Sequence, residues 1–165
     1  MDELTTSRLR LRPLRAADAE RIFEIYSHPL AAPWTGEHTL QEIRDEISFY
    51  ERNAAGGGWC MYGVVLLETG ELIGDCGVVP LELVGPELEL MYDIHLDYWG
   101  RGIAGEAARA VMQHAFPATG AAQLIAVAKP DNVASLRILE KNGFERDGTM
   151  LAYGEELLRF VRRAP

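Results

Sequence analysis

The sequence has few cysteines, no long apolar run and no excess of basic residues, and each shortage excludes a class of protein. Two cysteines among 165 residues are too few for a disulfide framework. No apolar run reaches the roughly 20 residues that a membrane-spanning helix needs, and no signal-peptide pattern opens the sequence. We therefore expect a reduced, cytoplasmic protein that has no membrane partner.

The charge balance is acidic, with 16 Lys and Arg against 25 Asp and Glu and a formal net charge of −9. Nucleic-acid binding relies on a basic face, so we expect no nucleic-acid partner. The negative charge is compatible with a cationic substrate such as an amine, although solubility alone also accounts for it. With 48% hydrophobic residues the chain can bury one core, and we expect a single domain over residues 1–165.

Apolar periodicity predicts the order strand, two helices, three antiparallel strands, helix, strand, helix and two strands. The expected helices begin near residues 18, 39, 105 and 132, and Pro117 is expected to close the third. Gly56–Gly58 predicts a mobile turn after the second helix. This order is typical of a mixed α/β (α+β) fold with helices on both faces of one sheet. The expected strands span residues 8–12, 60–68, 72–79, 87–96, 124–128, 144–150 and 155–161.

A glycine-rich turn lies between an expected strand and an expected helix. Gly100, Gly102 and Gly105 match the pattern G-x-G-x-x-G. Glycine lets the backbone come close to a ligand, and the first amides of a helix have no partner within the helix. Together with the helix dipole these amides favour an anion, and Arg101 adds a positive charge. The turn therefore predicts a site for a diphosphate.

The same pattern is the fingerprint of dinucleotide-binding enzymes, so a nicotinamide or flavin enzyme is an alternative. Two features count against it. The turn comes late, after an antiparallel section, and the strand at 124–128 runs into Lys129 and Pro130 where a ribose-binding acid is usual. A P-loop nucleotidase is excluded because the chain has no G-x-x-x-x-G-K-[ST] sequence.

Three segments together resemble the GCN5-related N-acetyltransferase (GNAT) superfamily, and especially its branch that acetylates the N-termini of ribosomal proteins. They are Thr6–Leu14 with the following Asp18-Ala19, Tyr92–Ala107 and Asn132–Phe144. The resemblance implies a mostly antiparallel sheet with one parallel, splayed strand pair. It also implies direct transfer from acetyl-coenzyme A to a primary amine, which is a protein N-terminus or a cationic small molecule. No metal takes part, and a homodimer is expected.

The resemblance also implies which residues hold the cofactor. In the family, the pantetheine arm lies like an added strand between the two splayed strands, and the diphosphate lies on the glycine turn. A backbone amide near Ile94 then faces the thioester oxygen. Asn132 forms a hydrogen bond with the pantetheine arm, or it only caps the helix that begins there. The cofactor residues expected here are Ile94, Leu96, Trp99, Gly100, Arg101, Gly102, Ile103, Ala104, Gly105 and Asn132.

Two residues are catalytic candidates by the same resemblance. Glu89 matches a strand position that carries a glutamate base in several relatives, where it acts directly or through water. Ser135 matches a serine that donates a hydrogen bond to the departing thiolate. Many family members have a tyrosine as the general acid at the position of Leu139, and because leucine cannot act as an acid, Ser135 becomes the candidate here. The plain alternatives are a surface carboxylate for Glu89 and an ordinary helix serine for Ser135. A bulge, common in this strand of the family, would shift the positions after Glu89.

Acceptor selection is expected from the segment 28–38, which forms one wall of the acceptor site in the family. Trp34 and Tyr92 are the substrate-binding candidates, with Trp34 as a core residue the alternative. A different class of function is also open. A binding or sensor module for acyl-coenzyme A would keep the glycine turn and Asn132 without efficient catalysis.

Overall fold

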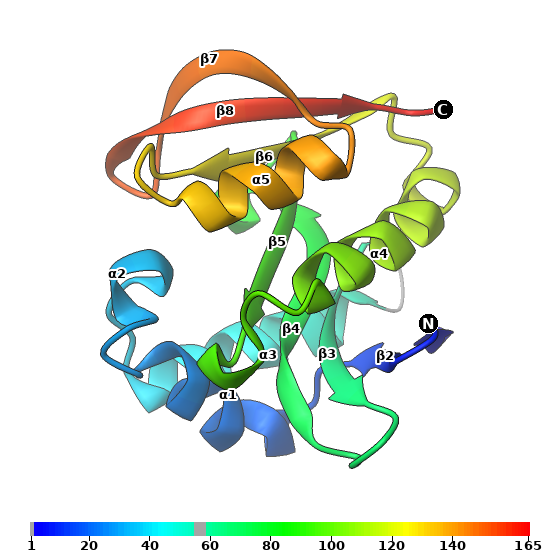
Figure 1. Ribbon diagram of the computed structural model, residues 1–165, viewed down its shortest axis with the longest axis vertical. Coiled ribbons are helices and arrows are strands. Elements are labelled where there is room, and N and C mark those ends of the chain that lie inside the picture. Colours follow the sequence, from blue (N-terminus) through cyan, green and yellow to red (C-terminus); the bar gives the residue numbers. More distant parts are fainter. Residues whose placement is uncertain (1, 55–58) are drawn as a thin grey trace.

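The computed structural model describes residues 2–54 and 59–165 (Figure 1). Within these residues, eight strands form one sheet in the order β1-β2-β3-β4-β5-β6-β8-β7. Every neighbouring pair is antiparallel except β5 and β6, which run parallel. The strands are β1 (Leu4–Thr5), β2 (Leu9–Pro13), β3 (Cys60–Leu66), β4 (Leu72–Pro80), β5 (Leu88–Ile94), β6 (Gln123–Ala128), β7 (Glu145–Ala152) and β8 (Glu155–Arg163).

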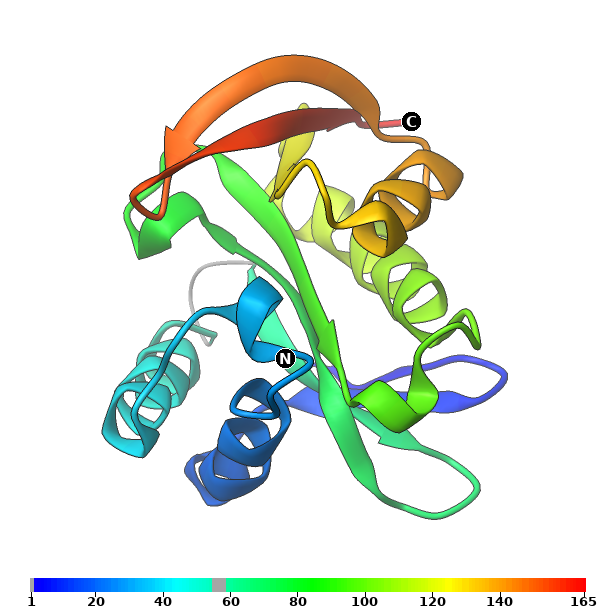
Figure 2. The same cartoon turned by 60° about the vertical axis from the view of Figure 1, so that its left-hand side comes forward.

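Helices cover both faces of this sheet, as the sequence predicts. Figure 2 shows α1 and α3 on one side of the central strands, and α4 and α5 on the other. None of the helices among the described residues is both long and apolar enough to cross a membrane. The helices are α1 (Ala19–Tyr26), α2 (Ala32–Thr35), α3 (Leu40–Ala54), α4 (Ile103–Thr119) and α5 (Val133–Lys141).

Local sequence explains several of these elements. In β2 the leucines are buried and the arginines between them are exposed or half-buried, which is the alternation of a half-buried strand. Before α3, the Thr39 amide donates to the Glu42 carboxylate at 2.7 Å, and the Glu42 amide donates to the Thr39 hydroxyl at 3.2 Å. This is the expected capping box.

The sheet separates two apolar cores. The core under α4 contains Leu90 and Ile94 of β5, whereas Met91 packs into the core under α1 and α3. The register of β5 against β4 is continuous from Leu88 to Ile94, so the expected bulge is absent from this pair. Alternate residues of β5 therefore keep to opposite faces along its whole length.

Other expectations need correction. Pro117 does not close α4 but lies within its last turn, where a missing amide affects one bond only. The helix ends instead at Thr119 and is capped by Gly120, whose left-handed φ of 67° suits glycine. Strand β1 and the one-turn helix α2 were not expected, because both are too short to show periodicity. The turn predicted at Gly56–Gly58 lies outside the described residues.

Candidate active site

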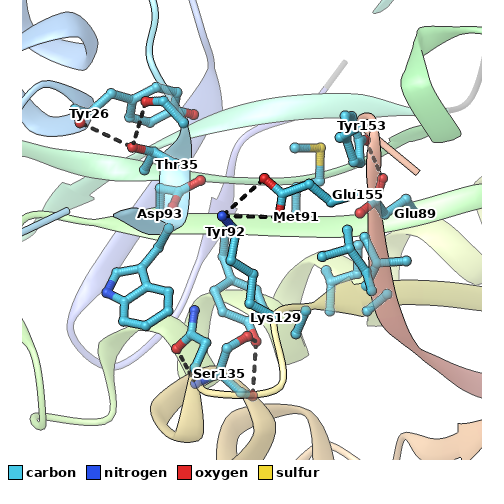
Figure 3. Close-up of a pocket in the computed structure, with 18 of the residues that line it drawn as sticks. Tyr26, Thr35, Glu89, Met91, Tyr92, Asp93, Lys129, Ser135, Tyr153 and Glu155 are labelled. Atoms are coloured by element: carbon cyan, nitrogen blue, oxygen red, sulfur yellow. Dashed lines mark hydrogen bonds and ion pairs between the residues drawn. The ribbon is translucent and has the colours of Figure 1, made fainter. Parts of the chain in front are cut away.

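A pocket of about 380 Å³ lies where β5 and β6 separate (Figure 3). These strands pair at a single point, between Glu89 and Ile125. The pocket wall includes residues from α3 on one face of the sheet and from α5 on the other. The pocket therefore reaches through the gap in the sheet. It brings together Trp34, Glu89, Tyr92, Asn132 and Ser135, all of which the sequence predicted as site residues.

The backbone of β5 presents a free edge to this gap. The His95 amide donates to the Ile73 carbonyl at 2.7 Å, and the Leu81 amide donates to the Glu87 carbonyl at 2.9 Å. Bonded and non-bonded pairs alternate along an antiparallel ladder, so the odd-numbered residues of β5 bond to β4. The amides of Tyr92 and Ile94 consequently point away from β4, into the gap beside β6.

The glycine-rich turn follows the end of this edge. Gly100 and Gly102 have φ values of 72° and 74°, the left-handed region that glycine tolerates best. Gly102 is the N-cap residue of α4, so the free amides at the start of this helix lie next to the turn. The indole of Trp99 donates to the Ile94 carbonyl at 2.6 Å and ties the turn to the strand. Leu96 lies between them in a short 3-10 helix.

The N-terminal segment holds the turn from behind. Arg8 donates to the Arg101 carbonyl at 2.8 Å and to the Glu106 carboxylate at 2.7 Å. The Thr6 hydroxyl donates to the same carboxylate at 2.5 Å. Burial raises the pKa of Glu106, but the bonds from Thr6 and Arg8 outweigh burial and leave the pKa lowered. The charge of Glu106 is thus held by Arg8 and not directed at the turn.

Asn132 and Ser135 belong to the start of α5. The Asn132 side-chain oxygen accepts the Ser135 amide at 3.1 Å, so Asn132 caps the helix. The Tyr92 hydroxyl lies 2.8 Å from the Ser135 hydroxyl and 3.3 Å from the Ser135 carbonyl. A Tyr–Ser hydroxyl pair therefore lines the α5 side of the pocket. The sequence singled out both residues but did not predict their contact.

Glu89 is buried, with 3% of its surface exposed, so it is not a surface carboxylate. The Tyr153 hydroxyl donates to it at 2.5 Å. Burial raises the pKa of Glu89 to about 7, and the bond from Tyr153 offsets part of this rise. A carboxyl group with this pKa exchanges its proton readily near neutral pH, as a general base must.

Tyr153 is a site residue that the sequence did not predict. It lies in the turn between β7 and β8, where its φ of 54° is unusual for a tyrosine. The Tyr153 amide donates to the Glu82 carboxylate at 2.7 Å, which anchors the turn against the segment between β4 and β5. A tyrosine before a glycine at a hairpin tip was the only local signal, and nothing in the sequence linked it to Glu89.

The opposite end of the pocket is acidic. Asp93 and Glu46 line it, and Asp75 lies directly opposite Asp93 in the β4–β5 register. The Tyr26 hydroxyl donates to Asp75 at 2.7 Å. Burial raises the pKa of Asp75 to about 7. Burial and the adjacent Asp75 carboxyl raise the pKa of Asp93 well above its ordinary range.

Of the remaining predicted residues, Trp34 lines the pocket and the others lie outside its wall. Trp34, in α2, is 36% exposed and lines the pocket, so it is not a core residue. Within the described residues, no three His, Cys, Asp or Glu side chains are grouped to hold a metal ion. The predicted cofactor residues outside the pocket wall lie at the end of β5 and after it: Ile94, Leu96, Trp99, Gly100, Arg101, Gly102, Ile103, Ala104 and Gly105.

A family model described as an acetyltransferase (GNAT) domain matches residues 8–145. The chain belongs to the GNAT acetyltransferase family. The resemblance inferred from the three sequence segments and the fold class are both confirmed, and a nicotinamide enzyme is no longer an alternative.

Comparisons along the whole chain agree with this placement. The acetyltransferase is 33% identical to the uncharacterized N-acetyltransferase YoaA of Bacillus subtilis, covering 91% of this chain and 86% of that protein. It superimposes on a crystal structure of an acetyltransferase from Agrobacterium tumefaciens with a TM-score of 0.85 and 28% identity, covering 99% and 95% of the two chains. It also shares its fold with RimL, a ribosomal alpha-N-protein acetyltransferase in complex with coenzyme A. There the TM-score is 0.80 at 16% identity, and 98% of each chain is covered.

Proposed function

We propose that this acetyltransferase uses acetyl-coenzyme A to acetylate a primary amine, which enters from the α1–α3 face of the sheet. The observation that carries the proposal is the free edge of β5. It begins beyond the single pairing of Glu89 with Ile125 and runs to the glycine turn. An extended ligand that bonds to this edge would have the turn at one end and the pocket at the other.

The residues present fit the cofactor. Acetyl-coenzyme A supplies an activated acetyl thioester and carries a diphosphate. The amides of the turn Gly100–Gly105 and the start of α4 suit that diphosphate, and Arg101 adds positive charge. The free amides of Tyr92 and Ile94 suit the amide-bearing arm, and one of them suits the thioester oxygen as an oxyanion donor. RimL, a neighbour in fold, has coenzyme A bound, which supports this assignment.

Glu89 is proposed to receive the proton of the incoming amine, directly or through one water. A lysine-type amine has a pKa of about 10.4 and an α-amine of about 8. Both are mainly protonated at neutral pH, so removal of the proton is part of the reaction. Tyr153 holds the Glu89 carboxylate in place and keeps its pKa from rising further.

Ser135 is proposed to donate a hydrogen bond to the departing thiolate. Its hydroxyl is placed by the Asn132 cap and by Tyr92, which lies 2.8 Å away. Tyr92 then supports the leaving-group side of the site, and its direct contact with the acceptor stays a prediction. Trp34 lies on the α1–α3 side, where it is proposed to contact the acceptor.

The test is thiol release from acetyl-coenzyme A with a panel of amines and of peptides with free N-termini. We expect Glu89→Gln to lower kcat roughly 100-fold or more, as loss of a general base does. We expect Ser135→Ala to lower it roughly tenfold, for one lost hydrogen bond to a charged group. Tight binding of acetyl-coenzyme A with no turnover on any acceptor would point instead to a sensor module.

Three further expectations stay predictions. All strands described belong to one sheet, which supports a single catalytic domain over residues 1–165. The homodimer is implied only by the family resemblance, and the cytoplasmic location only by sequence composition.

A further inference from the structure

The acidic end of the pocket holds two aspartates where a sheet disfavours them. Asp75 and Asp93 are direct partners across β4 and β5, and both lie on the face covered by α1 and α3. Like charges directly opposite each other destabilise a sheet. Because this arrangement lowers the stability of the sheet, we infer that the two aspartates have a role other than folding.

The surrounding side chains leave the pair incompletely neutralised. Tyr26 donates to one oxygen of Asp75, but the other oxygen, Oδ1, has no partner within the described part of the chain. Asp75 is only 1% exposed, and it lies behind the wall that Tyr26 and Asp93 form. A buried oxygen acceptor without a donor costs stability and needs an explanation.

The other titratable groups around the pair are a carboxyl, a phenol and an imidazole. From α3 come Glu46 and Tyr50, and burial raises the pKa of Glu46. His38 lies beside the Tyr26 ring, with 5.5 Å between ring centroids, and its Nε2 lies 2.8 Å from the Thr35 carbonyl. No arginine lines the pocket within the described residues.

Among the described residues, one lysine lines the pocket, and it pairs with a carboxylate other than Asp75 or Asp93. Lys129 follows β6, and its ammonium group lies 3.1 Å from the Glu155 carboxylate (Figure 3). Glu155 is the first residue of β8, so the lysine is paired with a carboxylate outside the aspartate pair. The acidic end therefore keeps its excess of carboxyl groups.

We propose that the acceptor carries a second ammonium group, which binds at Asp93 and Glu46 while its reacting amine lies near Glu89. The acceptor class is thus a diamine or polyamine. This inference rests on the proposed function and adds the chemistry of the substrate. An ammonium group brings a positive charge and three donors, which match the carboxyl oxygens gathered here.

The dimensions of β5 are compatible with two cationic positions. Glu89 and Asp93 are four residues apart on one face, so their Cα atoms lie about 13 Å apart at about 3.3 Å per residue. The reacting centre lies between them, next to Tyr92. A second charge within reach of Asp93 is therefore a few carbon atoms from the reacting amine. A protein N-terminus has no second charge at a fixed position of this kind.

The experiment compares α,ω-diamines of three to five carbons and spermidine with monoamines of equal length. We expect kcat/KM for the preferred diamine to exceed that of its matched monoamine by roughly 10- to 100-fold, the range of a hydrogen-bonded charge pair. Asp93→Asn should remove most of this preference, so that the diamine and its matched monoamine are used about equally. Asp45→Asn, which removes an exposed charge from the outer face of α3, should keep the preference.

A second readout does not depend on turnover. The diamine should raise the melting temperature of the parent protein and of Asp45→Asn, and it should not raise that of Asp93→Asn. Equal use of diamines and monoamines, or best use of a peptide N-terminus without any effect of Asp93→Asn, would overturn the inference alone. If no amine of any kind is acetylated, the proposed function falls together with it.

Discussion

The hydrogen bond between Tyr153 and Glu89 offers a quantitative prediction. Tyr153→Phe removes the hydroxyl that donates to the Glu89 carboxylate at 2.5 Å. A hydrogen bond to a charged group contributes about 1.5–3 kcal/mol, and one pKa unit corresponds to about 1.36 kcal/mol. Tyr153 is 47% exposed, so water replaces part of the lost bond and the lower end of the range applies. We therefore expect the pKa of Glu89 to rise by about one unit from its value of about 7.

The direction of the accompanying stability change follows from linkage. Burial raises the pKa of Glu89 from 4.5 to about 7 in the folded protein. Between these two values the folded protein keeps a proton that the unfolded chain has released. The free energy of unfolding contributed by Glu89 therefore falls as the pH rises through this window. In Tyr153→Phe the free energy of unfolding should continue to fall to a pH about one unit higher than in the parent, because the pKa of Glu89 is higher.

Carbon NMR of protein labelled at the glutamate side-chain carboxyl measures this pKa without any knowledge of the acceptor. The resonance of Glu89 is assigned as the one lost in Glu89→Gln. Tyr98→Phe is the matched control, because it removes a tyrosine bond to a different carboxylate, that of Glu71. Titration of Glu89 near 4.5 in the parent, or the same pKa in the parent and Tyr153→Phe, would refute the reasoning.

Three other predictions concern the acid pair, the sheet and the glycine turn. Burial raises the pKa of Asp75 to about 7, so the stability that protonated Asp75 contributes is lost as the pH rises from about 4 to about 7. In urea unfolding, the free energy of unfolding of Asp75→Asn relative to the parent should therefore be greater at pH 8 than at pH 5. Gly77→Ala would place a Cβ atom 2.3 Å from a carbonyl oxygen of β3, and it should lower the free energy of unfolding by about 1–3 kcal/mol in the same assay. Arg8→Gln removes the hydrogen bonds from Arg8 to the Arg101 carbonyl and to Glu106, which support the glycine turn. Steady-state kinetics should therefore show a KM for acetyl-coenzyme A that is higher by roughly tenfold, with kcat nearly unchanged. The control Arg10→Gln, at an exposed neighbouring arginine, should have no such effect.

The features that the sequence predicted well depend on neighbours along the chain. The alternation in β2, the capping box before α3 and the cap at Asn132 each involve a few consecutive residues. The left-handed turn needed Gly100 and Gly102 because other residues seldom adopt those backbone angles. The family resemblance then supplied the topology, including the parallel pair of β5 and β6.

The features that it did not predict depend on register and on distant segments. Glu89 and Tyr153 are 64 positions apart, and their contact requires the tip of the last hairpin to fold over β5. Asp75 and Asp93 become partners only in one register of β4 against β5, and a shift of one residue would place them on opposite faces. Hydrophobic patterning fixes which face is buried, but it does not identify the polar partners that meet there.

The most direct measurement is mass spectrometry of an amine panel incubated with the protein and acetyl-coenzyme A, with free thiol quantified in the same samples. Transfer to a primary amine predicts one acetylated amine for each thiol released, and parallel losses of both in Glu89→Gln. Thiol release without an acetylated amine, or no effect of acetyl-coenzyme A on the melting temperature of the protein, would contradict the proposed function.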